Sequence, residues 1–190
     1  MFYAIIILVA MVLTASLNAI FEMATFLYSA FAVTLLTVAV ILIDGLFAFI
    51  IRRLPERYFD YRRKIYRVEK KERKFYKAIG VKSWRGLVLD LGMFTSFSKS
   101  RFSKPDDPLY TGRFLLESCY GVIIHVVCVI VGFSVMAIIP RHALGMGLPV
   151  ALVNAVLNIL PIFVLRYNTP KIATIHERNL RKKSKKDKTL

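Results

Sequence analysis

Apolar and polar positions divide this chain into four long apolar runs and two strongly polar segments. A helix that crosses a bilayer needs about 20 consecutive, mostly apolar residues. Four stretches meet this requirement, at residues 2–21, 27–51, 114–139 and 143–165. The first and the fourth contain no charged side chain, and the second contains a single acid, Asp44. The pattern therefore predicts an all-α, polytopic membrane protein: one membrane domain with four transmembrane helices.

The positive charges are concentrated in the two polar segments. Of the 28 Lys and Arg residues, 18 lie at 52–113 and nine at 166–188, and the formal net charge is +16. Cytoplasmic loops of membrane proteins carry such an excess, so we expect a multi-pass protein of the cell membrane with both termini and the basic loop in the cytoplasm. The basic tail, residues 172–190, is expected to be disordered at 178–188 and attracted to anionic headgroups.

Two alternatives bear on this topology. Residues 2–21 are long enough for a signal sequence, and cleavage would leave three spans, although the stretch lacks the basic start that such sequences have. A soluble nucleic-acid-binding protein could have the same charge. Apolar runs of this length exclude that class, so no nucleic-acid partner is expected.

The segment at residues 52–113 interleaves basic and aromatic side chains. From Pro55 to Gly80 they recur at three- and four-residue intervals, which predicts one amphipathic helix in the headgroup plane, ending near Gly80. A short basic turn around the only tryptophan, Trp84, follows. Two interpretations stay open. The segment is either a surface helix that steadies the bundle or a lid over a substrate with an anionic head, such as a phospholipid or coenzyme A.

Polar side chains inside the apolar runs are the candidates for chemistry, because such residues are costly in hydrocarbon and mark functional sites. Glu117 and His125 are eight residues apart in the third span, about 12 Å along a helix, so both can line one cavity that opens toward the cytoplasm. A neutral His125 can take a proton from a hydroxyl group. The alternative is a structural hydrogen bond between His125 and one of three polar residues of other spans: Asp44, Asn154 and Asn158.

The fourth span adds a polar face. Asn154 and Asn158 are four residues apart and therefore share one side of a helix. Pro161 cannot donate a backbone hydrogen bond, so it frees a carbonyl about one turn earlier, near Leu157. The asparagines either form hydrogen bonds that hold the helices together or form a polar surface that binds hydroxyl groups of a sugar or headgroup. Arg166 follows at the expected cytoplasmic boundary.

The two cysteines, Cys119 and Cys128, lie nine residues apart in the third span. Two thiols on one helix at that spacing cannot form a disulfide, so both are expected to be reduced. No residues with metal-ligand spacing lie near them, and no metal or other cofactor is expected.

Three segments together resemble a known family. Residues 69–85 (EKKERKFYKAIGVKSWR) are similar to a family stretch that runs from a Glu through an aromatic residue to I/V-K-x-W-K/R. Residues 114–119 (FLLESC) with His125 resemble E-[ST]-x-x-x-E-x-x-H, and residues 158–171 resemble N-x-P followed by QRYNRPR. The family is that of the glycosyl-4,4'-diaponeurosporenoate acyltransferases, small integral-membrane enzymes of staphyloxanthin-type carotenoid synthesis.

The resemblance implies transfer of a fatty acyl group to a sugar hydroxyl on a membrane-anchored glycolipid. In this hypothesis His125 is the general base, and Glu117 orients either His125 or a sugar hydroxyl. Acyl-CoA or another acyl donor is the co-substrate, and the partners are membrane lipids and a lipid-linked acceptor. The acceptor is a glycosylated or other lipid with a hydroxyl at the cytoplasmic face. The oligomeric state stays open. The residues expected to bind the acceptor, the donor or developing negative charge are Glu69, Lys82, Trp84, Arg85, Asn158, Arg166 and Asn168.

Two rival functions are compatible with the sequence. One is a non-catalytic membrane module that binds anionic lipid or a partner protein through its basic loop. The other is a membrane enzyme that handles prenyl phosphates, which needs acids to hold a metal ion. Only Asp44 and Glu117 lie within the predicted spans, which disfavours this last function.

Overall fold

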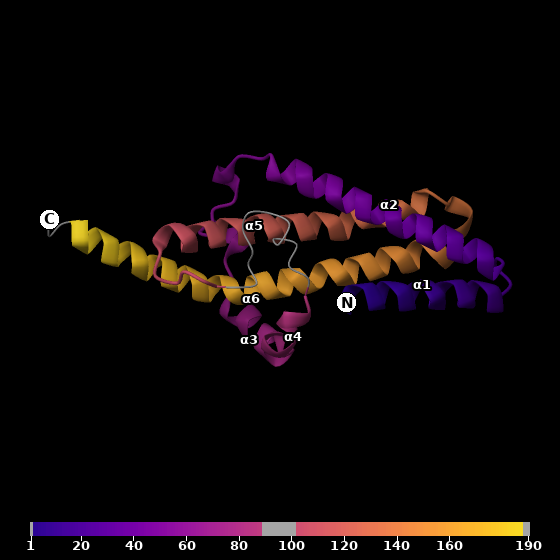
Figure 1. Cartoon of the computed structure of the whole chain (residues 1–190), viewed down its shortest axis with the longest axis horizontal. Helices are drawn as coiled ribbons and strands as arrows, with labels where there is room; N and C mark the ends of the chain where they lie inside the picture. Colours follow the sequence, from indigo (N-terminus) through magenta and orange to yellow (C-terminus); the bar gives the residue numbers. More distant parts are fainter. Residues whose placement is uncertain (1, 89–101, 188–190) are drawn as a thin grey trace. The chain divides into compact units, whose positions relative to one another are not determined.

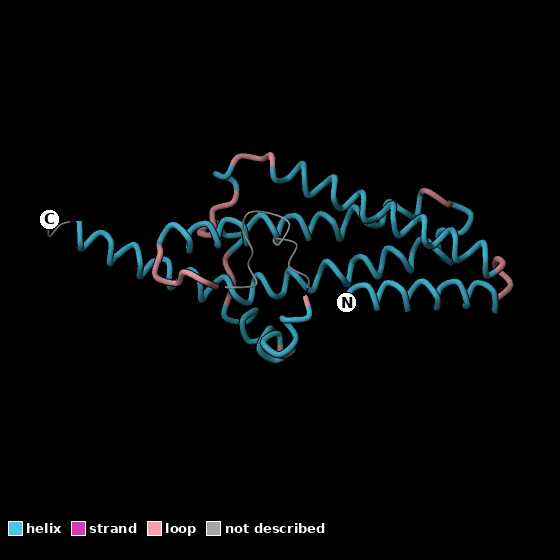
Figure 2. Tube along the Cα trace, viewed as in Figure 1, coloured by secondary structure: helices cyan, strands magenta, loops and turns pink. Residues whose placement is uncertain are grey.

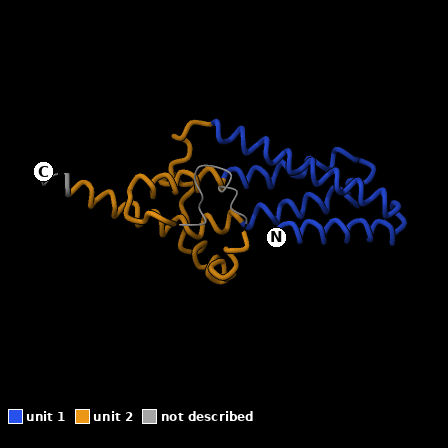
Figure 3. Tube along the Cα trace, viewed as in Figure 1, with its two compact units in different colours: residues 1–53, 123–160 blue, residues 54–122, 161–190 orange. Residues whose placement is uncertain are grey.

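The structure is a computed structural model that describes residues 2–88 and 102–187. All regular structure in these two ranges is helical (Figure 2). The chain divides into two compact units (Figure 3). Unit 1 comprises Met1–Arg53 and Ile123–Leu160, and unit 2 comprises Leu54–Val122 and Pro161–Leu190. The predicted all-α class is confirmed.

Unit 1 contains the apolar helices of the chain. Helix α1 (Phe2–Ile20) is followed after a short turn by the antiparallel helix α2 (Phe26–Arg52), which begins where the Thr25 side chain accepts a hydrogen bond from the backbone of Tyr28 (Figure 1). The end of helix α5 (Pro108–Val131) and the beginning of helix α6 (Leu148–Asp187) complete the unit. Between them the chain forms two 3₁₀ segments and one π turn: Gly132–Ala137, Pro140–His142 and Ala143–Gly147.

The described residues include four helices long and apolar enough to cross a membrane, which confirms the predicted number. They run over Phe2–Ile20, Phe26–Arg52, Pro108–Ala137 and Pro140–Lys185. Large apolar side chains point outward from α1 and α2: Leu8 is 62% exposed, Phe31 70% and Leu42 67%. A water-soluble protein rarely exposes so continuous an apolar surface, whereas hydrocarbon solvates it.

Small and medium side chains form the core of unit 1. Helix α2 contributes Ala32, Val33, Leu36 and Val40, which pack against residues of the segment that leads into α6 and of α6 itself: Val135, Met146, Val150 and Ala151. Lipid tails are as apolar as leucine, so close packing rather than the hydrophobic effect holds such helices together. Gly147 permits a close approach to another stretch of backbone, since a Cβ atom there would lie 2.9 Å from the Met136 Cα atom.

Unit 2 corrects the prediction of one amphipathic helix from Pro55 to Gly80, which is wrong. The segment forms 3₁₀ turns at Glu56–Tyr58 and Lys64–Tyr66 and helix α3 (Lys70–Ala78). Helix α4 (Val81–Trp84) and a 3₁₀ turn (Arg85–Leu87) follow. The predicted helix end is confirmed, because Gly80 has φ of 66°, a left-handed conformation that favours glycine.

The helix is interrupted because its aromatic side chains face the interior of unit 2. The ring of Phe59 stacks on that of Tyr120 with centroids 3.8 Å apart. Tyr66 is buried, and its hydroxyl donates to the carbonyl of Tyr58 at 3.2 Å. A continuous helix would place some of these rings on its outer face, so the gain from burying them favours a chain that turns.

The expected disorder of residues 178–188 is also wrong as far as Asp187, where the described part of the tail ends, because α6 continues to that residue. Packing within unit 2 anchors this part of the helix. Ile172 contacts Phe114 and Leu115, and the buried Asn179 donates from Nδ2 to the Pro105 carbonyl at 2.7 Å. Once anchored, a helix rich in Lys and Arg propagates at little cost.

We expect Gly147→Ala to lower the stability of the protein in detergent by about 1–3 kcal/mol, because the added methyl group meets the backbone of Met136. The thermal unfolding midpoint of the purified variant measures this effect. Gly45→Ala is the matched control, since a Cβ atom at Gly45 has no neighbour within 4 Å. An unchanged midpoint for Gly147→Ala would contradict the close approach.

Candidate functional site

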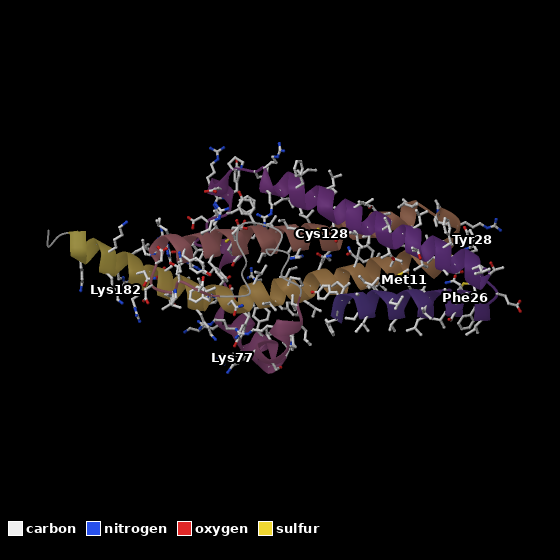
Figure 4. All side chains as sticks on the ribbon, viewed as in Figure 1. Met11, Phe26, Tyr28, Lys77, Cys128 and Lys182 are labelled. Carbon is white, nitrogen blue, oxygen red and sulfur yellow. The ribbon has the colours of Figure 1, made fainter. Side chains whose placement is uncertain are left out.

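A hydrogen-bonded group of polar side chains lies inside unit 1. It joins Asp44 of α2, His125 of α5, and Asn154 and Asn158 of α6. The Asn158 amide is its centre: Nδ2 donates to Asp44 Oδ2 at 3.0 Å, and to the backbone oxygen and Oδ1 of Asn154, each at 3.1 Å. Asn158 Oδ1 lies 2.8 Å from His125 Nδ1. Both asparagines are buried, and Cys128, labelled in Figure 4, lies one turn from His125 on α5. We call Asp44, His125, Asn154 and Asn158 the polar cluster.

The hydrogen bonds determine the form of the imidazole. Because Asn158 Nδ2 faces three oxygen atoms, the carbonyl Oδ1 must face the ring, and His125 Nδ1 is the donor. In the neutral ring the lone pair is then on Nε2. Sequence analysis left two roles open for His125, a structural hydrogen bond and catalysis. The structure shows the hydrogen bond, and this bond leaves Nε2 as the basic atom.

Along the axis of α1, the polar cluster lies near the first turn of that helix. The hydroxyl of Tyr3 donates to the Leu157 carbonyl at 3.2 Å, next to Asn158. This carbonyl is the one that Pro161 frees, so the prediction of a free acceptor near Leu157 is confirmed. Helix α1 has 19 residues and is about 28 Å long, close to the thickness of a hydrocarbon core. If α1 crosses the bilayer, the polar cluster lies at one boundary and not at the centre.

Unit 2 holds a second polar constellation, centred on Arg166 of α6. Its guanidinium forms an ion pair with Glu72 of α3 in which Nε and Nη2 both donate to the carboxylate. Nη1 donates to the Ile65 carbonyl at 3.0 Å, and Nη2 to the Arg67 carbonyl at 3.2 Å. These four hydrogen bonds join Arg166 to α3 and to the turn before it, so its side chain holds that segment in place.

The ion pair changes the titration of Glu72. The hydrogen bond from Arg166 lowers the pKa of the Glu72 carboxyl, and this effect exceeds the opposing effect of burial. The Tyr76 hydroxyl also donates to Glu72, and burial raises the pKa of Tyr76. Glu72 and Tyr76 were absent from the residues predicted to form a site. Their spacing of four residues on one helix face was the signal available in the sequence.

Several predicted site residues lie elsewhere in unit 2. Glu117 is buried and pairs with Arg113 Nη2 at 2.9 Å, one turn earlier on α5. Arg85 Nη1 lies 3.4 Å from Asn168 Oδ1, which joins two residues of the predicted set. The structure thus places Glu117 in unit 2 and His125 in unit 1, and the orienting role of Glu117 stays a prediction.

Two of the remaining predicted residues of unit 2, Lys82 and Trp84, lie on the short helix α4. Trp84 donates from Nε1 to the Ile79 carbonyl at 3.0 Å, a bond that holds the indole over the turn at Gly80. Lys82 is exposed, as is Glu69, which precedes α3. Across the described residues, no group of His, Cys, Asp and Glu could hold a metal ion, and both cysteines are buried free thiols.

Comparison with protein families provides the identification. The sequence model of the glycosyl-4,4'-diaponeurosporenoate acyltransferase family matches residues 55–178. The chain belongs to this family. The match covers His125, Asn158 and Arg166, and Asp44 lies before it. No curated protein and no solved structure matches the chain. Membership in this acyltransferase family, which acts in carotenoid biosynthesis, confirms the resemblance carried by the three sequence segments.

We expect Glu72→Gln to expose residues 67–77 to trypsin at neutral pH, because it removes the charge that holds Arg166. In the wild type the pKa of Glu72 is lower in the folded protein than in the unfolded chain, where it is near 4.5. The stabilisation is therefore fully present above pH 4.5 and is lost as the pH falls through the lowered pKa. The rate of cleavage, followed by mass spectrometry, measures the change at neutral pH.

The control is Glu69→Gln, which removes an exposed carboxylate just before the same helix. It should leave the cleavage rate unchanged. Equal protection of the Glu72→Gln variant and the wild type would show that the ion pair does not hold the segment.

Proposed function

We propose that this chain is a membrane-embedded acyltransferase that moves a fatty acyl group onto a hydroxyl of a glycosylated lipid at the cytoplasmic face. The observation that carries the proposal is the hydrogen bond between His125 Nδ1 and Asn158 Oδ1, in a chain of an acyltransferase family. That bond puts the lone pair of a neutral imidazole on Nε2, and this is the atom that we propose takes the proton of the acceptor hydroxyl. Attack by a hydroxyl on an acyl carbonyl needs such a base, since the hydroxyl is a weak nucleophile at neutral pH.

The proposed reaction has two proton transfers. His125 Nε2 takes the proton of the acceptor hydroxyl while its oxygen bonds to the acyl carbonyl carbon. When the tetrahedral intermediate collapses, the bond from carbon to the donor's leaving group breaks, and the imidazolium returns the proton to that group. With an acyl-CoA donor the products are the ester and the free thiol of coenzyme A, and no oxidant, metal or cofactor enters the balance.

The location of the polar cluster supports a reaction at the cytoplasmic boundary. The cluster is level with Tyr3, at the end of α1 away from the α1–α2 turn. Tyrosines are enriched at membrane interfaces, where the ring is in the acyl region and the hydroxyl meets polar groups. The segments that carry most Lys and Arg residues follow α2 and the apolar part of α6, which favours the cytoplasm for this side.

Unit 2 supplies the groups that we propose for recognition of the acyl donor or the acceptor headgroup. Lys82 and Arg85 are exposed cations on either side of Trp84, a combination suited to a phosphate beside an apolar surface. Asn168 lies next to Arg85 and takes part in the same surface. Arg166 has a positioning role in this proposal, because its hydrogen bonds hold the segment before α3.

We expect cells that express the wild type to contain a glycolipid that has gained a fatty-acyl mass, and His125→Ala to reduce it about 100-fold or more. Untargeted lipid mass spectrometry, at matched amounts of membrane protein, measures this difference. The control is His142→Ala, because His142 packs against Tyr28 in unit 1 and lies outside the polar cluster. Full product with His125→Ala would remove the proposed base.

The host must supply a glycosylated lipid acceptor, so the same comparison is made in a strain that synthesises a carotenoid glycoside. Lipid profiles that are identical with and without the wild-type protein in that strain would contradict acyl transfer. The test of the remaining alternative, a non-catalytic module, is neutralisation of the basic residues between Arg62 and Lys74. That change should affect such a module strongly, while His125→Ala should only loosen its packing.

A further inference from the structure

We propose that Asp44 is a positioning residue for His125 and acts through the Asn158 amide. The inference rests on the proposed function, and it concerns a residue outside the segment that the family model matches, residues 55–178. It assigns a role to the single acid in the apolar part of α2.

The geometry forms a chain of two hydrogen bonds. The Asp44 carboxyl accepts from Asn158 Nδ2 at 3.0 Å, and Asn158 Oδ1 accepts from His125 Nδ1 at 2.8 Å. The other carboxyl oxygen, Oδ1, is buried and has no hydrogen-bond partner among the residues that the structure describes. The thiol of Cys128 donates to the backbone carbonyl of Asp44 at 3.8 Å. The acid is therefore connected to the imidazole by way of one amide group.

An amide can present either its oxygen or its NH₂ group to a neighbouring ring. A negative or strongly accepting group on one side of Asn158 binds the NH₂ group and turns the oxygen toward His125. The ring then keeps its hydrogen on Nδ1 and its lone pair on Nε2, as the proposed base requires. The backbone oxygen and Oδ1 of Asn154 accept from the same NH₂ group, but both belong to the helix that carries Asn158. Asp44 is the acceptor that another helix contributes. Either oxygen of the Asp44 carboxyl can accept a hydrogen bond from this NH₂ group.

The position of Asp44 also argues against an incidental acid. Unit 1 presents apolar side chains on the outer faces of α1 and α2, and a carboxyl within such a helix carries a large desolvation cost. A neutral side chain at this position would remove that cost and leave helix packing intact. The acid lies where it reaches the amide that orients His125, which favours a role in the reaction.

The first test is kinetic and uses full-length protein in membranes. Asp44→Leu should lower kcat about 10-fold or more with little change in KM for the acceptor, because substrate contacts remain. Asp44→Asn keeps an oxygen that can accept from Asn158 but can also turn its NH₂ group toward it, so its kcat should fall between those of the wild type and Asp44→Leu. Thr37→Val is the control on the same helix, since the Thr37 hydroxyl bonds only the carbonyl of Val33 among the described contacts.

A double-mutant cycle tests the route through Asn158. In an Asn158→Leu background, Asp44→Leu should change kcat by no more than about 2-fold, because the connection to His125 is already broken. Effects that multiply, or full activity of Asp44→Leu alone, would overturn the proposal. Asp44→Ala replaces Asp44→Leu in the cycle if the larger side chain is not accommodated.

The second test does not depend on turnover. The chain has three histidines, so ¹⁵N-histidine NMR of the protein in micelles can resolve the His125 ring, assigned by its loss in His125→Gln. The wild type should show the hydrogen on Nδ1, and Asp44→Leu should shift it toward Nε2, the common tautomer of a free imidazole. An unchanged tautomer would overturn the role of Asp44 even in an active enzyme. Absence of acylated product from the wild type would instead contradict the proposed function.

Discussion

The need to pair every polar group in a region without water governs unit 1. Polar side chains of three helices, α2, α5 and α6, meet at the amide of Asn158. Each end of this amide has partners, so it cannot rotate without leaving a donor or acceptor unpaired in a medium where that is expensive. The fixed amide in turn fixes the imidazole of His125. A network centred on one paired amide both joins the helices and determines which nitrogen of the imidazole carries the hydrogen.

Unit 2 depends on a different interaction, the clamp between Arg166 and Glu72. The guanidinium of Arg166 binds two backbone carbonyls, those of Ile65 and Arg67, in addition to the carboxylate. Carbonyls that accept from a side chain are turned away from a helical pattern. Together with the burial of Phe59 and Tyr66, this interaction explains why the basic segment breaks into turns before α3.

The parts that sequence analysis predicted are those decided by local chemistry. Apolar length alone predicts the spans, and the cost of polarity in hydrocarbon singled out Asp44, His125 and Asn158. The free carbonyl at Leu157 followed from Pro161, although its partner, Tyr3, did not. The helix from 55 to 80 was mispredicted because periodicity cannot reveal a partner 94 residues away, which is the separation of Glu72 and Arg166.

Helix α1 has a consequence for the lipid environment. At 19 residues it is the shortest of the four apolar helices, and its first turn is tied to α6 by the bond from Tyr3 to Leu157. A bilayer thicker than this helix must thin locally around it, and the cost of that mismatch acts on the helix end that carries this bond. Since Leu157 precedes the central amide of the polar cluster, hydrophobic mismatch acts directly on the residue that orients His125. The acyl-chain length of the surrounding lipids thus influences how the protein holds the imidazole of His125.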